Sequence, residues 1–73
     1  MDLITIKDSE GDFVIFPMQN LISIEEDRKS NTSHIYILGR EYPITVNMLS
    51  DEVLMDIYGQ LNGVVFESDF ECD

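Results

Sequence analysis

Residues 50–61 read SDEVLMDIYGQL, and this stretch provides the helical part of the predicted fold. It predicts a helix over about residues 51–61, because Ser50 is a good N-cap and two acids occupy the first turn. The apolar residues recur at helical spacing and form one stripe. The residues of this stripe are Val53, Leu54, Ile57, Tyr58 and Leu61. A helix of about three turns is not stable alone, so we expect its stripe to dock on a sheet.

Five short segments before this helix have the composition of β-strands. They are separated by turn residues, and they span Leu3–Ile6, Phe13–Phe16, Leu21–Ile24, His34–Leu38 and Tyr42–Val46. Residues 2–16 predict a hairpin, whereas the charged run at residues 25–29 and the polar residues 30–33 predict a loop. Pro43 argues for an edge or a bulge, because proline cannot donate to a β-ladder.

Together these elements predict a small α+β domain. We expect an antiparallel sheet or partial barrel of five or six strands, with one helix in the C-terminal half packed on it. Residues 1–66 form the compact domain, and residues 67–73 form an acidic strand or tail. A chain of 73 residues has a thin core, which leaves dimerisation through strand edges open as a way to bury more apolar area.

The charge is strongly negative and unevenly distributed. The chain has 15 acids and 4 bases, for a net charge of -11. This charge would repel phosphates, so direct binding to nucleic acid or to anionic lipid is disfavoured. The single Cys72 excludes an intrachain disulfide framework, and neither a signal peptide nor a membrane span is expected. We expect a cytoplasmic protein with a positively charged partner.

The last seven residues place an acid at every second position. In an extended segment these four carboxylates line one edge about 6.6 Å apart, and Phe66 and Phe70 face the other way. The acids of this row are Glu67, Asp69, Glu71 and Asp73. The alternative is a frayed tail, which is common at chain ends.

A second group of acids lies on the predicted helix. Glu52 and Asp56 are four residues apart and face the same side, and Asp51 is nearby in the first turn. If the helix and the tail lie close together, two acidic rows could imitate the two phosphate backbones of DNA. The alternative is that Asp51 and Glu52 only favour the start of the helix.

No catalytic, metal or cofactor site is predicted. His34 and Cys72 are single residues far apart in sequence, which is weak evidence for a nucleophile and its base. Asp8, Glu10 and Asp12 do not follow the order of an EF-hand loop, and no glycine-rich phosphate loop is present. We expect a protein that is not an enzyme, with His34 half-exposed in its strand.

The order of the strands and helix resembles the small FlbD-like family associated with bacterial flagella. The likeness covers residues 3–61 and includes Asn20–Glu26 before the loop and the phrase Ser50-Asp51-Glu52-Val53 after the last strand. This resemblance implies a structural or regulatory adaptor that acts through a sheet edge and the helix.

Size, charge and evenly spaced acids also resemble the small acidic host-takeover proteins of bacteriophages that mimic DNA. This resemblance implies a basic host target, such as a histone-like nucleoid protein. We therefore expect the chain to bind and inhibit a basic, nucleic-acid-binding protein. The expected contact residues are the tail acids Glu67, Asp69, Glu71 and Asp73, supported by Asp51, Glu52 and Asp56 of the helix.

Overall fold

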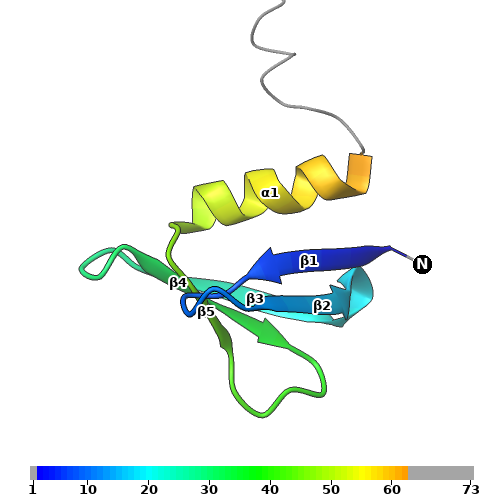
Figure 1. The fold of residues 1–73 in the computed structure, drawn as a ribbon, viewed down its shortest axis with the longest axis horizontal. Helices are drawn as coiled ribbons and strands as arrows, with labels where there is room; N and C mark the ends of the chain where they lie inside the picture. Colours follow the sequence, from blue (N-terminus) through cyan, green and yellow to red (C-terminus); the bar gives the residue numbers. More distant parts are fainter. Residues whose placement is uncertain (1, 63–73) are drawn as a thin grey trace, which may run out of the picture.

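The computed structural model describes residues 2–62, which form five strands, one short 3-10 helix and one α-helix (Figure 1). In chain order the elements are β1 (Leu3–Lys7), β2 (Phe13–Pro17), η1 (Met18–Asn20), β3 (Leu21–Asp27), β4 (Thr32–Ile37), β5 (Ile44–Val46) and α1 (Ser50–Asn62). The predicted α+β class is confirmed. The tail row and the possible sixth strand lie outside the described residues.

The five strands are antiparallel and divide between two sheets. One sheet is the β1–β2 hairpin, and the other has the order β3-β4-β5. The turn of the hairpin reaches the second sheet, where the Ser9 N–H donates to the Thr45 carbonyl at 2.8 Å. Gly11 has a φ of 92° in this turn, a conformation that glycine adopts without steric cost.

The second hairpin is longer than the sequence predicted. The acids at residues 25–27 continue β3 and pair with β4 through Glu25–His34, Glu26–Ser33 and Asp27–Thr32. The predicted loop over residues 25–33 is therefore wrong, and only residues 28–31 connect the two strands. Charged residues fit this strand because Glu25 and Asp27 point to its exposed face.

The predicted fifth strand is shortened at its start. β5 spans only Ile44–Val46, and Tyr42 is exposed before it. Pro43 precedes the ladder instead of interrupting it, as expected for a residue without an N–H.

The start of α1 also differs from the prediction. The Leu49 carbonyl accepts hydrogen bonds from Glu52 N–H at 3.0 Å and from Val53 N–H at 3.1 Å. Leu49 therefore holds the N-cap position, and Ser50 is the first helical residue.

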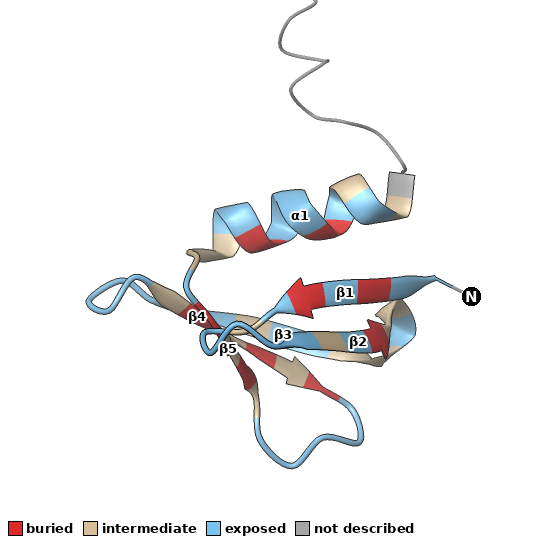
Figure 2. Ribbon diagram, in the orientation of Figure 1, coloured by how far each residue is buried: buried red, intermediate tan, exposed pale blue. Residues whose placement is uncertain are grey.

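The core lies between α1 and the two sheets, where the buried segments of helix and strands face one another (Figure 2). The buried hydrophobic residues among those described are Ile4, Ile6, Phe16, Ile35, Ile37, Ile44, Val46, Val53 and Ile57. The helix inserts Val53 and Ile57, with Leu61 partly buried behind them. Leu54 and Tyr58 are exposed, so the buried stripe is narrower than predicted.

Ser33 is a polar residue inside this core. It is fully buried in β4, and its hydroxyl donates to the Met48 carbonyl at 2.7 Å. This bond fixes the connection between β5 and α1 against the middle strand of the second sheet. It also satisfies a buried hydroxyl that would otherwise be costly to remove from water.

We predict that Ser33→Ala destabilises the fold by about 1–3 kcal/mol, because the Met48 carbonyl loses its buried donor. Urea unfolding followed by circular dichroism measures this change. Ser23→Ala is the matched control, since Ser23 is exposed on β3. Equal midpoints for the two variants would contradict the assigned role of Ser33.

Candidate functional site

Helix α1 is held at its beginning by a carboxylate from β3. Oε1 of Glu26 accepts hydrogen bonds from the Ser50 N–H at 3.0 Å and from the Ser50 hydroxyl at 2.6 Å. The side chain of Glu26 is only 19% exposed. The negative charge of Glu26 lies at the N-terminus of α1, where it interacts favourably with the positive end of the helix dipole. Glu26 therefore stabilises the docked helix.

The environment of Glu26 favours its ionised form. The hydroxyl and the N–H of Ser50 lower the pKa of this carboxyl below its ordinary value, against an opposing contribution from burial. Arg28 also lowers the pKa, because its Nε lies 2.6 Å from Oε2. Glu26 therefore has a structural role, because its carboxylate is bonded to Ser50 and Arg28 of the same chain.

The other end of α1 is held by Gln60, which reaches β1. Oε1 of Gln60 accepts from the Thr5 N–H, and Nε2 donates to the Thr5 carbonyl, both at 2.8 Å. This pair of bonds covers the edge of β1 that faces away from β2. It also places α1 alongside β1, with the two elements running in opposite directions (Figure 1).

The acids predicted on the helix lie on this clamped element. Glu52, Asp56 and Gln60 follow one another at intervals of four residues and so share a side of α1. Asp56 accepts a hydrogen bond from Nε2 of Gln60 at 3.1 Å. Asp51, Glu52 and Asp56 are all exposed, which leaves their carboxylates accessible to a partner. We call these three residues the helix acids.

The predicted tail acids cannot be placed beside the helix acids. Glu67, Asp69, Glu71 and Asp73 lie outside the described residues, as does Cys72. The structure therefore brings together only the helix part of the predicted contact surface.

The acids of the first hairpin turn have a different arrangement. Oδ1 of Asp8 accepts from the Glu10 and Asp12 N–H groups, at 2.9 Å each, and so stabilises the turn. Glu10 and Asp12 themselves are exposed. Within residues 2–62, no three His, Cys, Asp or Glu side chains lie close enough together to hold a metal ion.

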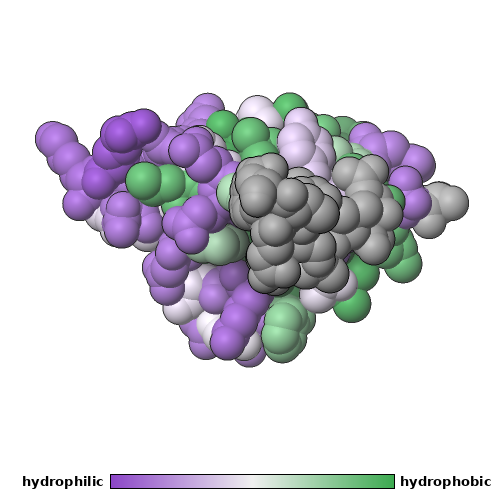
Figure 3. Space-filling view, turned by 90° about the horizontal axis from the view of Figure 1, so that it is seen from above, coloured by the Kyte–Doolittle hydropathy of each residue, from purple (hydrophilic) through white to green (hydrophobic). Residues whose placement is uncertain are grey.

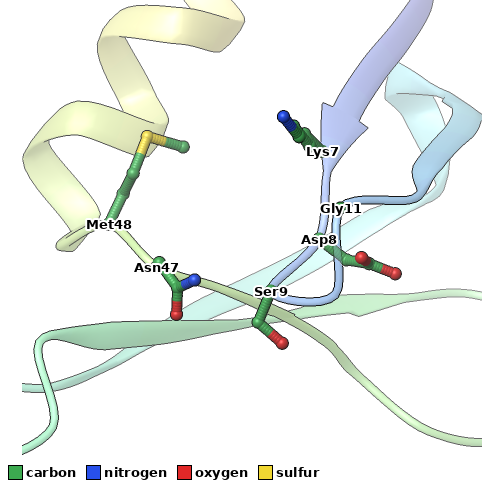
Figure 4. Close-up of a pocket in the computed structure, with 6 residues that line it drawn as sticks. All are labelled: Lys7, Asp8, Ser9, Gly11, Asn47 and Met48. Carbon is green, nitrogen blue, oxygen red and sulfur yellow. The ribbon is translucent and has the colours of Figure 1, made fainter.

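An open cavity of about 270 Å³ lies between this turn and the segment that leads into α1 (Figure 4). It is lined by Lys7, Asp8, Ser9, Gly11, Asn47 and Met48. A serine is present, but neither histidine nor cysteine is in the lining, and Asp8 is engaged by the backbone of the turn. The lining therefore provides no nucleophile paired with a base.

Most of the charge in the described part of the chain is not neutralised internally. Arg28–Glu26 is the only ion pair among residues 2–62. Viewed from the helix side, hydrophilic side chains cover much of the surface, and some hydrophobic ones are also exposed (Figure 3). The helix acids consequently present their charge without a cationic partner from the described residues.

His34 lies where the sequence predicted it, half-exposed in β4. Its Nδ1 is 3.0 Å from the Thr45 hydroxyl of β5, which gives it a role between neighbouring strands. On the same strand, burial raises the pKa of Tyr36, and the charge of Glu25 adds to this effect. His34 and Tyr36 therefore make contacts with side chains of neighbouring strands on the surface of the sheet.

Glu26 and Gln60 were missed as functional positions in the sequence. Glu26 stands in a charged run that resembles a solvated loop, and its partner is 24 residues away. Gln60 binds a residue 55 positions away. Neither partner is signalled by local spacing, although the four-residue interval from Asp56 to Gln60 indicates a shared helix side.

Comparison of the chain with protein-family models, curated proteins and solved structures found no match. In the described part of the chain, α1 is too short and too polar to cross a membrane.

Glu26 gives the fold a defined pH dependence. Because its pKa is lowered in the folded state, its contribution is present above the ordinary pKa of about 4.5 and is lost as the pH falls through the lower, folded pKa. We predict that Glu26→Gln reduces the loss of stability on acidification, measured by urea unfolding across this range.

Glu25→Gln is the matched control for this variant. It removes the same charge from the neighbouring, exposed position of β3, which makes no contact with Ser50. An identical pH dependence in the two variants would rule out the assigned role of Glu26.

Proposed function

We propose that this chain binds and inhibits a basic, nucleic-acid-binding protein by presenting carboxylates in place of phosphates. The observation that carries this proposal is the set of exposed acids on a clamped helix, in a chain of net charge -11. Lys and Arg side chains of the partner would pair with the helix acids. The chain would then occupy the nucleic-acid site of the partner and exclude the nucleic acid. A histone-like nucleoid protein of a bacterial cytoplasm is a partner of this kind.

The spacing of the helix acids supports phosphate mimicry. Four residues of helix advance by about 6 Å, so Glu52 and Asp56 are separated by about that distance along the axis. Alternate phosphates along one strand of B-DNA are separated by about 6.8 Å along the helix axis. The two intervals are close enough for both to fit one row of basic side chains.

The attachment of α1 also supports this function. Glu26 and Gln60 hold its two ends, and Val53 and Ile57 are buried between them. Carboxylates on a fixed helix lose little further freedom on binding, so more of their interaction free energy contributes to affinity.

The tail acids extend the proposed surface in sequence. They add four carboxylates beyond the end of α1, at Glu67, Asp69, Glu71 and Asp73. Their contribution is separable by mutation, because the helix acids lie on a different segment. In a bacterium, inhibition of a nucleoid protein would serve host takeover by a bacteriophage, as the compositional resemblance implies.

A second candidate is an adaptor that acts through apolar contacts, as the FlbD-like resemblance implies. The exposed Phe13 and Ile15 of β2 favour it, because they offer apolar area at a sheet edge. Salt separates the two functions. Binding through carboxylates weakens as ionic strength rises, whereas apolar contacts change little.

The direct test is displacement of a fluorescent DNA duplex from a purified histone-like nucleoid protein, followed by anisotropy. We expect the chain to release the duplex at low salt and progressively less as salt increases. Glu52→Gln combined with Asp56→Asn should weaken displacement about 2- to 30-fold, from two surface charge pairs.

Glu10→Gln combined with Asp12→Asn is the matched control. It removes the same charge from the hairpin turn, and we expect only a small effect. A third variant with amides at the four tail acids measures the contribution of the tail. If the chain releases no DNA at any salt concentration, mimicry of this partner is wrong.

A further inference from the structure

The β1–β2 hairpin has an exposed apolar face. Its inner face carries core residues such as Ile4, Ile6 and Phe16, and its outer face carries the residues that alternate with them. The outer residues are Leu3, Thr5 and Lys7 of β1 and Phe13, Ile15 and Pro17 of β2. Phe13 is 68% exposed and Ile15 is 62% exposed, so β2 presents apolar area to its surroundings.

The outer edge of β2 also has backbone groups available for pairing. Thr5 directs its N–H and carbonyl away from β2, toward Gln60. In an antiparallel ladder the residue opposite, Ile15, must then direct its own groups away from β1. The same alternation applies to Phe13, and among residues 2–62 no backbone hydrogen bond from another element reaches either residue.

This edge is the least charged part of the chain. Residues 13–24 contain no charged side chain and form the longest such run in the sequence. The outer face of the hairpin carries no carboxylate, and Lys7 is its only charged residue. Two copies of net charge -11 repel each other over most of their surfaces, so a close approach is least costly at this edge.

We propose that two copies of the chain associate through β2, whose outer edges pair antiparallel and join two hairpins into a four-stranded sheet. Phe13 of each copy lies opposite Ile15 of the other, so that both residues exchange their N–H···O bonds. This register gives four intermolecular hydrogen bonds. It also gives two aromatic–β-branched side-chain pairs, which stabilise neighbouring strands.

Pro17 disfavours one neighbouring register. A shift that places Ile15 opposite itself would pair Phe13 with Pro17, which has no N–H, and would leave the Phe13 carbonyl without a donor. The antiparallel arrangement also separates the two acidic turns. Each turn lies beside the uncharged η1 of the other copy, and the contact is symmetric and closed.

This dimer does not rest on the proposed function and responds oppositely to salt. Screening reduces the repulsion between two acidic copies, so added salt strengthens the dimer. The same salt weakens binding of the helix acids to a basic partner. Failure of one proposal is therefore distinguishable from failure of the other.

Sedimentation equilibrium of the full chain over a concentration series tests this inference. We expect a species of twice the 8.4 kDa chain mass, favoured by concentration and by salt. Ile15→Pro removes the outward N–H, as Pro17 already does on the same strand edge, and it also replaces the isoleucine side chain that packs on Phe13 of the other copy. It should raise the dimer dissociation constant about 5- to 150-fold, through two lost hydrogen bonds.

Two further variants decide the location of the contact. Ile15→Lys places a charge at the edge, at a position exposed enough to leave the fold intact, and should also disfavour the dimer. Ile22→Lys is the matched control, because Ile22 is likewise 62% exposed but lies on β3. A chain that stays monomeric in high salt, a dimer insensitive to Ile15→Lys, or equal loss in both lysine variants would each overturn β2 pairing.

Discussion

Helix α1 is attached to both sheets, and these contacts hold the fold together. The two sheets are separate ladders, and the helix contacts β1 of one and β3 of the other. Glu26 of β3 binds the first residue of the helix through two hydrogen bonds. Gln60, near the C-terminal end of the helix, binds Thr5 of β1 through two more. Between these points Val53 and Ile57 complete a core that has nine buried hydrophobic residues within residues 2–62. A core this small has little reserve, so these polar contacts matter more than they would in a larger domain.

The sequence allowed the elements to be predicted better than the contacts between them. Apolar periodicity located the helix, and β-rich composition between turn residues located the five strands that the structure describes. The periodicity overestimated the buried stripe at Leu54 and Tyr58, since local spacing does not reveal how wide a groove the sheets leave. Ser33 and Glu26 were assigned to a loop by their polarity, although each is satisfied by a distant partner. The helix acids were found from their spacing, whereas the position of the tail acids depends on residues outside those described.

The surface divides into two regions of different chemistry. The helix acids carry charge without an internal partner in the described part of the chain, while β2 and η1 are free of charge. Charge on the helix suits attraction to a basic protein, and an uncharged strand edge suits contact with a second copy. Both regions adjoin the same clamped core: the helix is fixed by Glu26 and Gln60, and β2 is fixed by its ladder with β1. A dimer formed at β2 would carry two sets of helix acids and could bind a partner at two points.

We propose the helix acids as the contact surface for a basic, nucleic-acid-binding partner. The most direct measurement is a map of backbone amide shifts in the isotopically labelled chain as an unlabelled histone-like nucleoid protein is added. We expect the largest changes over residues 51–56, reversed when competing DNA is added, with the amides of Phe13 and Ile15 little affected. Changes centred on β2, or no change at residues 51–56 when the partner is bound, would contradict this proposal.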